Sequence, residues 1–358
     1  MKLDFSLSRT CSTRMYSRSS RTGGEGKRMT ITELARRLKL STCTVSKIMN
    51  RSFTGFTYAP ATIRRVEAAA LKLGYVPNAH AQSLRTKRSM TVGVVVPSGL
   101  PYFTGALVES LEGSLRSLGF ETVISHSTAD HAKETHLIRN ILGRGIDGLL
   151  WIPYSNLSPE KLEIPVGFPL VLLDRPGFGT RFPTVMTDNR GACRELASRI
   201  ATAGQKSVVV LSSDCGDKSI FEREQGVSDV YGSRMKCVNA PNEQDAAFHK
   251  TAKILDKIAG KTLICLTQCL ALGALQAIRD RNFRVGVHLG FASFDDLPLC
   301  DIWQPSICRI EQNIEGLGSE AVKLLVAKIQ DPTVKQSLEI RIPARLIWND
   351  SVLPSPAV

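Results

Sequence analysis

The sequence lacks the features that define several common protein classes. No stretch approaches the roughly 20 consecutive apolar residues of a membrane-spanning helix, and the runs GLLWI and VVVL are of strand length at most. None of the nine cysteines belongs to a CxxC pair, so neither a zinc module nor a disulfide framework is indicated. A transmembrane protein is thereby excluded, and a reducing cytoplasm is the compartment that fits best.

Motifs for catalysis and cofactors are also missing. The sequence has no GxGxxG opening a helix after a strand and no GxxxxGK(S/T), so nucleotide binding is unsupported. His126, His131 and His136 are spaced five apart, which fits neither one helix face nor an HxxxH zinc pair. No Ser-His-Asp arrangement or carboxylate pair is evident. We therefore expect no enzyme, no metal site and no cofactor.

The excess positive charge lies in the first quarter of the chain. The 358 residues are enough for two or more domains, and they carry a net charge of +13. Residues 1–88 hold 18 Lys and Arg against 4 Asp and Glu, whereas residues 89–358 hold 28 against 29. A basic module on a neutral body predicts a polyanionic partner, because clustered cations release the counterions of a phosphate backbone. The alternative is a solvated basic tail.

Residues 1–28 are rich in Ser, Thr and Arg and show neither helical nor strand periodicity, which predicts a disordered basic extension. The composition also matches an organellar transit peptide. A third interpretation, which we favour, is that Met29 is the natural start and these residues are an upstream extension.

Residues 29–50 (MTITELARRLKLSTCTVSKIMN) predict two short helices around a tight turn. Thr30 can cap the first helix, with Glu33 where it completes a capping box. Ser41 is a natural N-cap for the second helix, whose outward positions are the small, polar or cationic side chains of Thr42, Cys43, Ser46 and Lys47. The pair is typical of a helix-turn-helix, although an ordinary helical hairpin would fit this segment alone.

A third amphipathic helix, PATIRRVEAAALKLGY (60–75), and the segment YVPNAHAQSLRTKRS (75–89) follow. Together, residues 29–89 resemble the headpiece and hinge of the lactose-repressor (LacI/GalR) family of bacterial transcription regulators. The matching positions keep the family's spacing over about 60 residues: Thr30, Ala35, Ser41, Thr44, Val45, Ser46, Asn50, Thr62, Val66, Ala69, Gly74, Tyr75, Pro77, Asn78, Ala81 and Leu84.

The resemblance implies how the headpiece (29–74) would meet DNA. The start of the second helix enters the major groove, so Thr42, Cys43 and Lys47 are the expected readers of base edges. Phosphate contacts, which position the helix without specifying sequence, are expected from Ser41, Thr44, Ser46 and Asn50. Two departures stand out. Lys39 replaces the usual turn glycine, so we expect it in a left-handed conformation. The insert RSFTGFTYAP is as long as in the fructose-repressor branch, which this chain resembles most.

The resemblance also assigns residues 75–89 to a hinge that folds when a dimer meets its operator. Asn78 and Ala81 would contact DNA there, and Leu84 would wedge into the minor groove. A core leucine is the alternative for Leu84.

Residues 90–358 alternate apolar runs with amphipathic stretches, which predicts parallel sheets covered by helices on both faces. The region resembles the periplasmic-binding-protein-like effector domain of the same family. It would have two doubly wound parallel-sheet subdomains, an N-subdomain of about 90–189 and 312–340 and a C-subdomain of about 190–311 and 341–358. The expected fold class is thus α/β with an all-α helix-turn-helix headpiece.

By that likeness, a small ligand binds beyond the carboxyl ends of the strands. Its contacts would come from Ser98, Phe103, Asp174, Arg223 and Asp295. Thr267-Gln268 stands where many members have Asn-Asp, which removes one carboxylate on the ligand side. The resemblance implies a sugar-like ligand, and the fructose-repressor likeness suggests a sugar phosphate bound through Arg223.

The combined prediction is a cytoplasmic, nucleoid-associated transcription regulator that works as a repressor. Its expected partners are a pseudo-palindromic double-stranded DNA operator, a sugar-like effector and a second copy of the chain in a homodimer, with no membrane. The alternative is a sugar-binding receptor or sugar-modifying enzyme on the same α/β body. A receptor or enzyme has no use for the net +14 of residues 1–88, so the regulator is favoured.

Overall fold

The computed structural model describes most of the chain from residue 29 onward, namely residues 29–51, 57–76, 88–98, 101–154, 162, 164–175, 182–213, 216–297, 300–335 and 337–352. The chain divides into two compact units, Met1–Gln82 and Ser83–Val358. We call their described parts the headpiece and the effector body. In these residues no helix is long and apolar enough to cross a membrane. The extension 1–28 and residues 52–56 of the insert after Asn50 lie outside the described residues.

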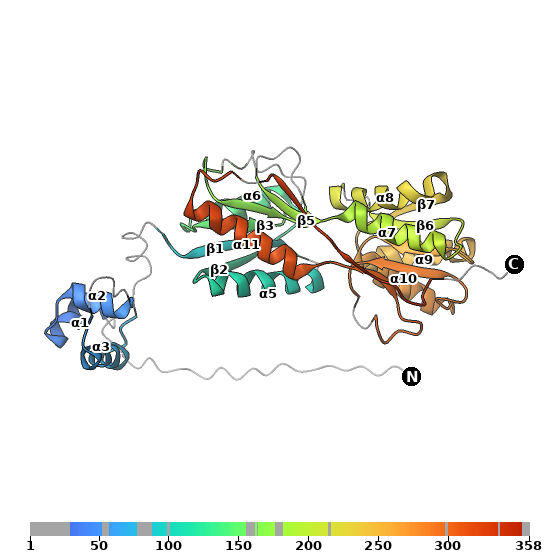
Figure 1. The fold of residues 1–358 in the computed structure, drawn as a ribbon. Coiled ribbons are helices and arrows are strands. Elements are labelled where there is room, and N and C mark those ends of the chain that lie inside the picture. Colours follow the sequence, from blue (N-terminus) through green and yellow to red (C-terminus); the bar gives the residue numbers. More distant parts are fainter. Residues whose placement is uncertain are drawn as a thin grey trace, which may run out of the picture. The chain divides into compact units, whose positions relative to one another are not determined.

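The headpiece is a three-helix unit of α1 (Ile31–Leu38), α2 (Thr42–Met49) and α3 (Pro60–Lys72) (Figure 1). Its core consists of six buried apolar side chains, with two from each helix: Leu34, Ala35, Val45, Ile48, Val66 and Ala70. Ser41 caps α2 by accepting a bond from the Thr44 N–H at 3.0 Å. Lys39 ends α1 at φ +53°, so the expected left-handed conformation is confirmed.

The capping box of α1 is only half formed. Thr30 Oγ1 accepts from the Glu33 N–H at 3.2 Å, as predicted. The Glu33 carboxylate instead binds Arg36 and Arg37, one turn further along the helix. Charge-assisted bonds to two guanidinium groups replace the expected bond back to Thr30, because they are the stronger ones.

The first sheet of the effector body is entirely parallel, in the order β11-β5-β4-β3-β1-β2 (Figure 1). Its strands are β1 (Thr91–Pro97), β2 (Glu121–Ser127), β3 (Gly148–Trp151), β4 (Leu170–Leu173), β5 (Thr184–Thr187) and β11 (Glu339–Ile342). Helices α5 (Pro101–Ser117) and α11 (Ile314–Gln330) pack together on one face, and α6 (His131–Leu142) covers the other. Alternate residues of β1 therefore face different helices, with Val94 toward α5 and α11 and Val95 toward α6.

The second sheet has the order β12-β10-β9-β8-β6-β7. Its strands are β6 (Val208–Ser213), β7 (Met235–Ala240), β8 (Thr262–Cys265), β9 (Gly290–Phe294), β10 (Cys308–Glu311) and β12 (Arg345–Ile347). Helices α7 (Asn189–Thr202) and α8 (Lys218–Tyr231) cover one face, and α9 (Gln244–Ile258) and α10 (Gln268–Asp280) the other. A short 3-10 turn, η2 (Gly232–Arg234), follows α8. The edge strand β12 runs antiparallel to β10, which the prediction of purely parallel sheets did not include.

The chain passes between the two sheets three times (Figure 1). The first passage leads from β5 to α7, the second from β10 to α11, and the third from β11 to β12. The first two passages are tied together, because Thr187 donates a hydrogen bond to the side-chain oxygen of Gln312. The fold class expected from the sequence, a helical headpiece with two α/β subdomains, is confirmed.

Candidate functional site

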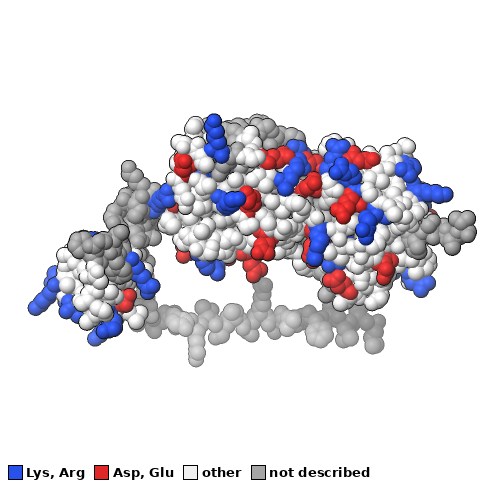
Figure 2. Space-filling view, viewed as in Figure 1, with Lys and Arg blue, Asp and Glu red and all other residues white. Residues whose placement is uncertain are grey.

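One candidate site is the outer face of α2 in the headpiece. Thr42 and Cys43, in its first turn, are exposed, and Lys47 one turn later is half-buried. Small side chains at these positions let a helix approach base edges closely, and Lys adds a donor for guanine. The space-filling view shows mostly Lys and Arg among the charged side chains of the headpiece (Figure 2).

The residues predicted to contact phosphates flank that face. Ser41 is exposed, and Thr44, Ser46 and Asn50 are half-buried. Ser41 and Thr44 are joined through their hydroxyls at 2.8 Å, and the Asn50 amide donates to Ser46 Oγ at 3.2 Å. These bonds hold the polar side chains along one helix. The remaining predicted DNA contacts, Asn78, Ala81 and Leu84, lie outside the described residues.

The second candidate site is the cleft of the effector body. Asp174 directly follows β4 of the first sheet, and Asp295 directly follows β9 of the second. Both adopt positive φ, +59° and +75°, a conformation that Asp tolerates better than most residues. Because ligands of parallel α/β sheets bind beyond the carboxyl ends of the strands, these two carboxylates stand where such a ligand would be held.

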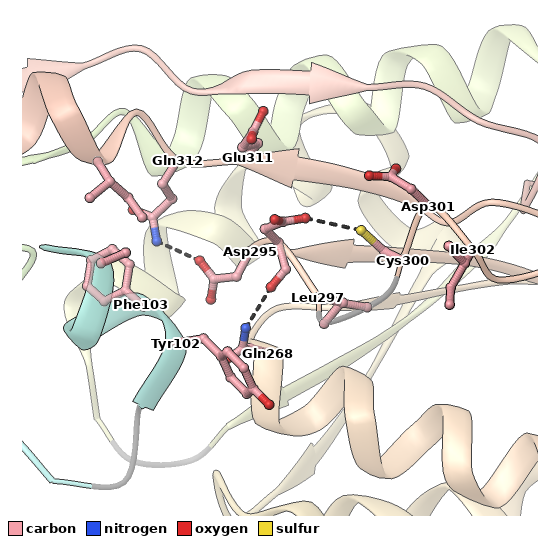
Figure 3. A pocket seen from close by; sticks show the side chains of 13 residues that line it. Tyr102, Phe103, Gln268, Asp295, Leu297, Cys300, Asp301, Ile302, Glu311 and Gln312 are labelled. Carbon is pink, nitrogen blue, oxygen red and sulfur yellow. Dashed lines mark hydrogen bonds between the residues drawn. The ribbon is translucent and has the colours of Figure 1, made fainter.

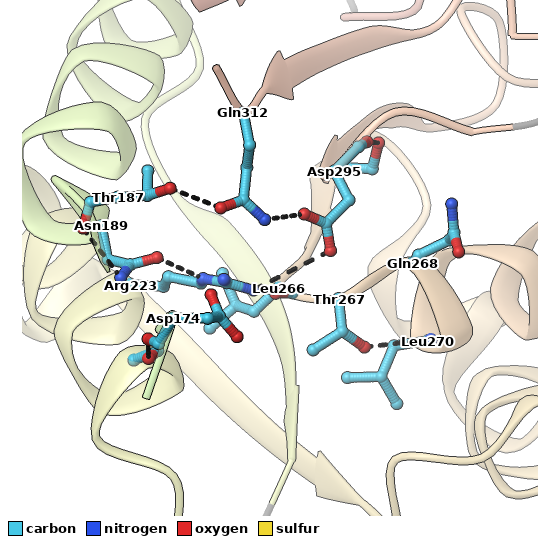
Figure 4. A network of polar contacts seen from close by, with 12 residues as sticks. Asp174, Thr187, Asn189, Arg223, Leu266, Thr267, Gln268, Leu270, Asp295 and Gln312 are labelled. Atoms are coloured by element: carbon cyan, nitrogen blue, oxygen red, sulfur yellow. Dashed lines mark hydrogen bonds and ion pairs between the residues drawn. The ribbon is translucent and has the colours of Figure 1, made fainter. Parts of the chain in front are cut away.

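Arg223 lies beside both carboxylates and forms an ion pair with Asp295 (Figure 4). It lies on α8 with 5% of its surface exposed. Its Nε donates to the Asn189 side chain and its Nη1 to the Leu266 carbonyl, each at 2.8 Å, and Nη1 is 4.0 Å from Asp295. Its guanidinium stacks over Phe294 at 3.6 Å. The group is thus fixed before any ligand arrives.

Gly226, three residues after Arg223, explains the R-x-x-G spacing of FEREQG. A Cβ at Gly226 would overlap the backbone of α7 at the Arg190 carbonyl. Glycine therefore lets α7 and α8 touch, which brings Asn189 of α7 within reach of Arg223.

Asp174 is a buried carboxylate whose ionised form is disfavoured. Burial raises its pKa to about 6, against the opposing effect of Arg175 and Arg223. Its backbone carbonyl accepts a bond from Ser219 Oγ at 2.7 Å. Among the described residues, its Oδ1 has no hydrogen-bond partner. A carboxylate with an open acceptor in a cleft is suited to a ligand hydroxyl or ammonium donor.

A pocket of about 650 Å³ lies beside this network (Figure 3). Tyr102, Phe103, Ala106 and Ile314 line it from one subdomain, and Gln268, Asp295, Asp296, Leu297, Cys300, Asp301, Ile302, Glu311 and Gln312 complete the lining. Asp295 accepts a bond from the Gln312 amide at 2.6 Å, and Gln312 accepts one from Thr187, so the pocket wall continues into the crossing strands (Figure 4). The volume suits a small organic ligand.

The structure brings together four of the five predicted ligand residues. Arg223, Asp174 and Asp295 share one network, and Phe103 lines the pocket with Asp295. Ser98 is exposed after β1, and its N–H donates to the Ser127 carbonyl. This bond continues the pairing of β1 with β2, and no described contact joins Ser98 to this network.

Sequence reasoning missed several residues of the site. Gln312, Asn189 and Thr187 hold the network together from the crossing segments, where no periodic pattern marks them. Gln268 was noted only for the carboxylate it replaces, yet it lines the pocket and donates to the Asp296 carbonyl at 2.6 Å. Among the described residues no group of His, Cys, Asp and Glu side chains is arranged to hold a metal ion.

Comparisons with known proteins agree with this architecture. The model of a periplasmic binding protein-like domain matches residues 197–352. Catabolite control protein A of Priestia megaterium is 26% identical over 340 residues, 90% of this chain and 99% of the relative. The protein of the same name from Staphylococcus aureus is 23% identical over 320 residues, 86% of this chain and 94% of the relative.

Solved structures are similar in fold along nearly the whole chain. The lac repressor dimer bound to operator and the anti-inducer ONPF has a TM-score of 0.78 at 23% identity, covering 91% of this chain and 100% of that one. The transcriptional regulator CelR in complex with cellobiose has a TM-score of 0.66 at 22% identity, covering 90% and 100%. These relatives are transcription regulators, and the predicted resemblance is confirmed, whereas the likeness to the fructose-repressor branch stays a prediction. Over most of its length the chain is thus similar to catabolite control protein A and to lactose-repressor (LacI) family regulators.

Proposed function

We propose that the chain is a sequence-specific DNA-binding repressor without enzymatic activity, acting in the cytoplasm on DNA of the nucleoid. A homodimer would bind a pseudo-palindromic operator, because one headpiece reads only a half-site. A small sugar-like ligand in the cleft would control operator affinity. The similar lac repressor structure is a dimer on its operator, and other similar structures hold ribose or cellobiose.

One observation carries the proposal: a capped helix with a polar outer face and a pocketed two-sheet body occur in one chain. Thr42 and Cys43 offer that face to a groove, while the cations of the headpiece supply sequence-independent attraction to phosphates. A sugar receptor or enzyme would need only the body. The headpiece therefore favours the regulator.

Ligand control has a physical route through the crossing segments. Asp295 contacts Gln312, which contacts Thr187 at the end of β5. A ligand that moves Asp295 would therefore shift two of the three segments that connect the subdomains. Arg341 of β11 binds Glu222 of α8 at 2.8 and 2.9 Å, a second tie across the same boundary. A shift of the subdomains would change how residues 75–89, with Asn78, Ala81 and Leu84, meet DNA. Such coupling is typically about 1–3 kcal/mol, or roughly 5–150-fold in affinity.

The test is a double substitution on α2. We expect Thr42→Ala with Cys43→Ala to lower the ratio of specific to non-specific DNA affinity by roughly 10–100-fold, because base contacts are lost while phosphate contacts remain. The preferred sequence is first selected by the full chain from a random DNA pool, and both affinities are then measured at one salt concentration.

The matched control is Thr57→Ala, an exposed threonine of the headpiece outside α2. It should leave both affinities unchanged. An equal loss of specific and non-specific binding in the double variant would show that α2 does not read bases, and selection of no preferred sequence would refute the repressor itself.

A further inference from the structure

The described charged side chains that line the ligand pocket are all acidic. Asp295, Asp296, Asp301 and Glu311 all contribute carboxylates to its wall. Among the described residues that line it, none is Lys or Arg. Figure 3 shows Asp295, Asp301 and Glu311 around the pocket, on β10 and on the segment between β9 and β10.

The arginines behind the wall do not balance these acids. Arg309 is shared, with Nε 2.6 Å from Asp296 and Nη1 2.9 Å from Asp301. Arg345 donates to Glu311 at 2.9 Å. Only Arg223 is near Asp295, at 4.0 Å. Three guanidinium groups therefore face four carboxylates.

The network beside the pocket has the same deficit, although its acids Asp174 and Asp217 do not line the pocket themselves. Arg175 lies 2.8 Å from Asp217 and 3.8 Å from Asp174, so one cation again serves two acids. Asp174 is more than nine-tenths buried, and its Oδ1 has no hydrogen-bond partner among the described residues. Figure 4 places this carboxylate next to Arg223, in the network that continues to Asp295. A buried acceptor without a donor is unfavourable, so it points to a donor that the ligand brings.

Two aromatic side chains stand opposite the acids. Phe103 and the 55% exposed Tyr102, both on α5, line the same pocket. Aromatic faces attract cations, and the attraction grows as the cation loses water. Carboxylates with aromatic rings form a site for a protonated amine, with the remaining oxygens left for hydroxyl groups.

The same wall is unsuited to a phosphate. A guanidinium binds phosphate best as a fork of two N–H groups. Arg223 already uses Nε and Nη1 within the protein, which leaves Nη2 alone without a partner among the described residues. A dianion would then face four carboxylates with only one free guanidinium nitrogen to bind it.

Resting on the proposed function, we infer that the ligand of this cleft is a hydroxyl-bearing cation, an amino sugar or a protonated amine of similar size. Phosphorylated sugars are excluded. The sugar phosphate suggested by the sequence is thereby replaced by a ligand of opposite charge.

The experiment measures ligand binding to the full chain without DNA, by thermal shift and calorimetry. The probes are matched sets on the same ring: the hexose, its 2-amino form and its 6-phosphate, each with gluco, galacto and manno configuration. We expect at least one amine to bind about tenfold or more tightly than its parent hexose, and no 6-phosphate to bind. Tighter binding of any hexose or phosphate than of its amine, or no stabilisation by any amine, would overturn the inference.

A substitution in the pocket wall tests whether the protein's own negative charge favours the amine over the hexose. Asp301→Asn removes one acid from the pocket wall, and Asp256→Asn is the control, because both side chains are 74% exposed and both pair with an arginine. We expect Asp301→Asn to weaken the amine by roughly 2–5-fold and to spare the parent hexose, and Asp256→Asn to change neither. Equal weakening of amine and hexose would contradict a charge-based site.

Failure of the proposed function is separable from failure of this inference. An amine that binds the chain but leaves DNA binding unchanged would refute ligand control and support the ligand class. DNA binding that responds to a sugar 6-phosphate would support ligand control and refute the ligand class.

Discussion

No described Lys or Arg of the headpiece is buried, whereas the effector body buries Arg223 and Arg309 together with the acids Asp174 and Glu134. The headpiece owes its stability to six apolar side chains and leaves its cations at the surface. Buried ionic groups in the body are costly unless they are paired. On the proposed function, the exposed cations of the headpiece are available to DNA phosphates, whereas the buried charges of the body surround the site of a small ligand.

The largest expected effect tests the buried charge of the body. Arg223→Ala leaves the Leu266 carbonyl and the Asn189 side chain without their donor. It also removes the cation that lies near Asp295. Breaking such a buried arrangement costs about 3–5 kcal/mol, so the melting temperature of the body should fall by roughly 6–15 °C. The ligand response should vanish, while ligand-free DNA binding stays near normal.

The control for that variant is Arg279→Ala, an arginine with a 69% exposed side chain paired to Asp280. Exposed pairs contribute about 1 kcal/mol or less, so little should change. A full ligand response in Arg223→Ala, measured by operator titration, would refute the assignment of the cleft.

The apolar core of the headpiece gives the next largest effect. Leu34 is 0% exposed, and Leu34→Ala should cost about 2–5 kcal/mol. A domain of this size has only a few kcal/mol of stability, so the headpiece should unfold and specific DNA affinity should fall by at least about 100-fold.

The matched control is Leu71→Ala, because Leu71 is 87% exposed on α3 of the same unit. Calorimetry should show the melting transition of the body unchanged in both variants. A body transition that shifts with Leu34→Ala would mean that the two units do not fold independently, contrary to the comparison.

Asp174 tests the cost of a buried charge in the body with an effect of opposite sign, because its substitution should stabilise the body. Burial raises its pKa to about 6, so the native state binds a proton more tightly than the unfolded chain. Stability contributed by that proton is present at low pH and is lost as pH rises from about 4 to about 6. At pH 7, Asp174→Asn removes a penalty of about 2–3 kcal/mol and should raise the melting temperature by roughly 4–9 °C.

Measurement of melting temperature against pH checks this. The advantage of Asp174→Asn over the unmodified chain should shrink between pH 7 and pH 4, and ligand affinity should fall because the negative charge is lost and one carboxylate oxygen is replaced by an NH2 donor. Asp256→Asn, at a 74% exposed side chain, should follow the unmodified chain. No gain in stability at pH 7 would mean that Asp174 is not a strained carboxylate.

The helices and the long buried strands were predictable from local pattern. The buried residues Val45 and Ile48 of α2 and Val66 of α3 belong to apolar positions that recur at helical spacing. Ser41 is a typical N-cap residue, and Lys39 stands where the family usually has glycine. The apolar runs of residues 90–358 do not mark four of the strands, namely β7, β10, β11 and β12. They are short or half-exposed, and the polar residues in EIRI and MKCVNA hide them from an argument based on apolar runs.

The candidate site was predictable only where a motif marks it. Asp174 and Asp295 each follow a strand, and Arg223 stands three residues before Gly226. The resemblance to the family therefore identifies all three. Gln312, Thr187 and Arg309 could not be found this way, because their roles come from long-range contacts between segments far apart in the chain. The sign of the charge in the pocket likewise depends on which arginine reaches which acid, and this is a property of the folded chain alone.

The smallest expected effect separates the two roles of Ser41, which caps α2, is exposed, and is a predicted phosphate contact. Ser41→Ala removes the acceptor for the Thr44 N–H and should cost about 1 kcal/mol, roughly 4–8 °C in the melting temperature of the headpiece. Ser41→Asn and Ser41→Asp both keep a capping oxygen, so both should keep stability. They differ in charge, and only Asp should repel DNA, lowering non-specific affinity at low salt and losing that deficit as salt screens it. If Asn destabilised the headpiece as much as Ala, Ser41 would not act as a cap. If Asp bound DNA as well as Asn, the start of α2 would not face a phosphate.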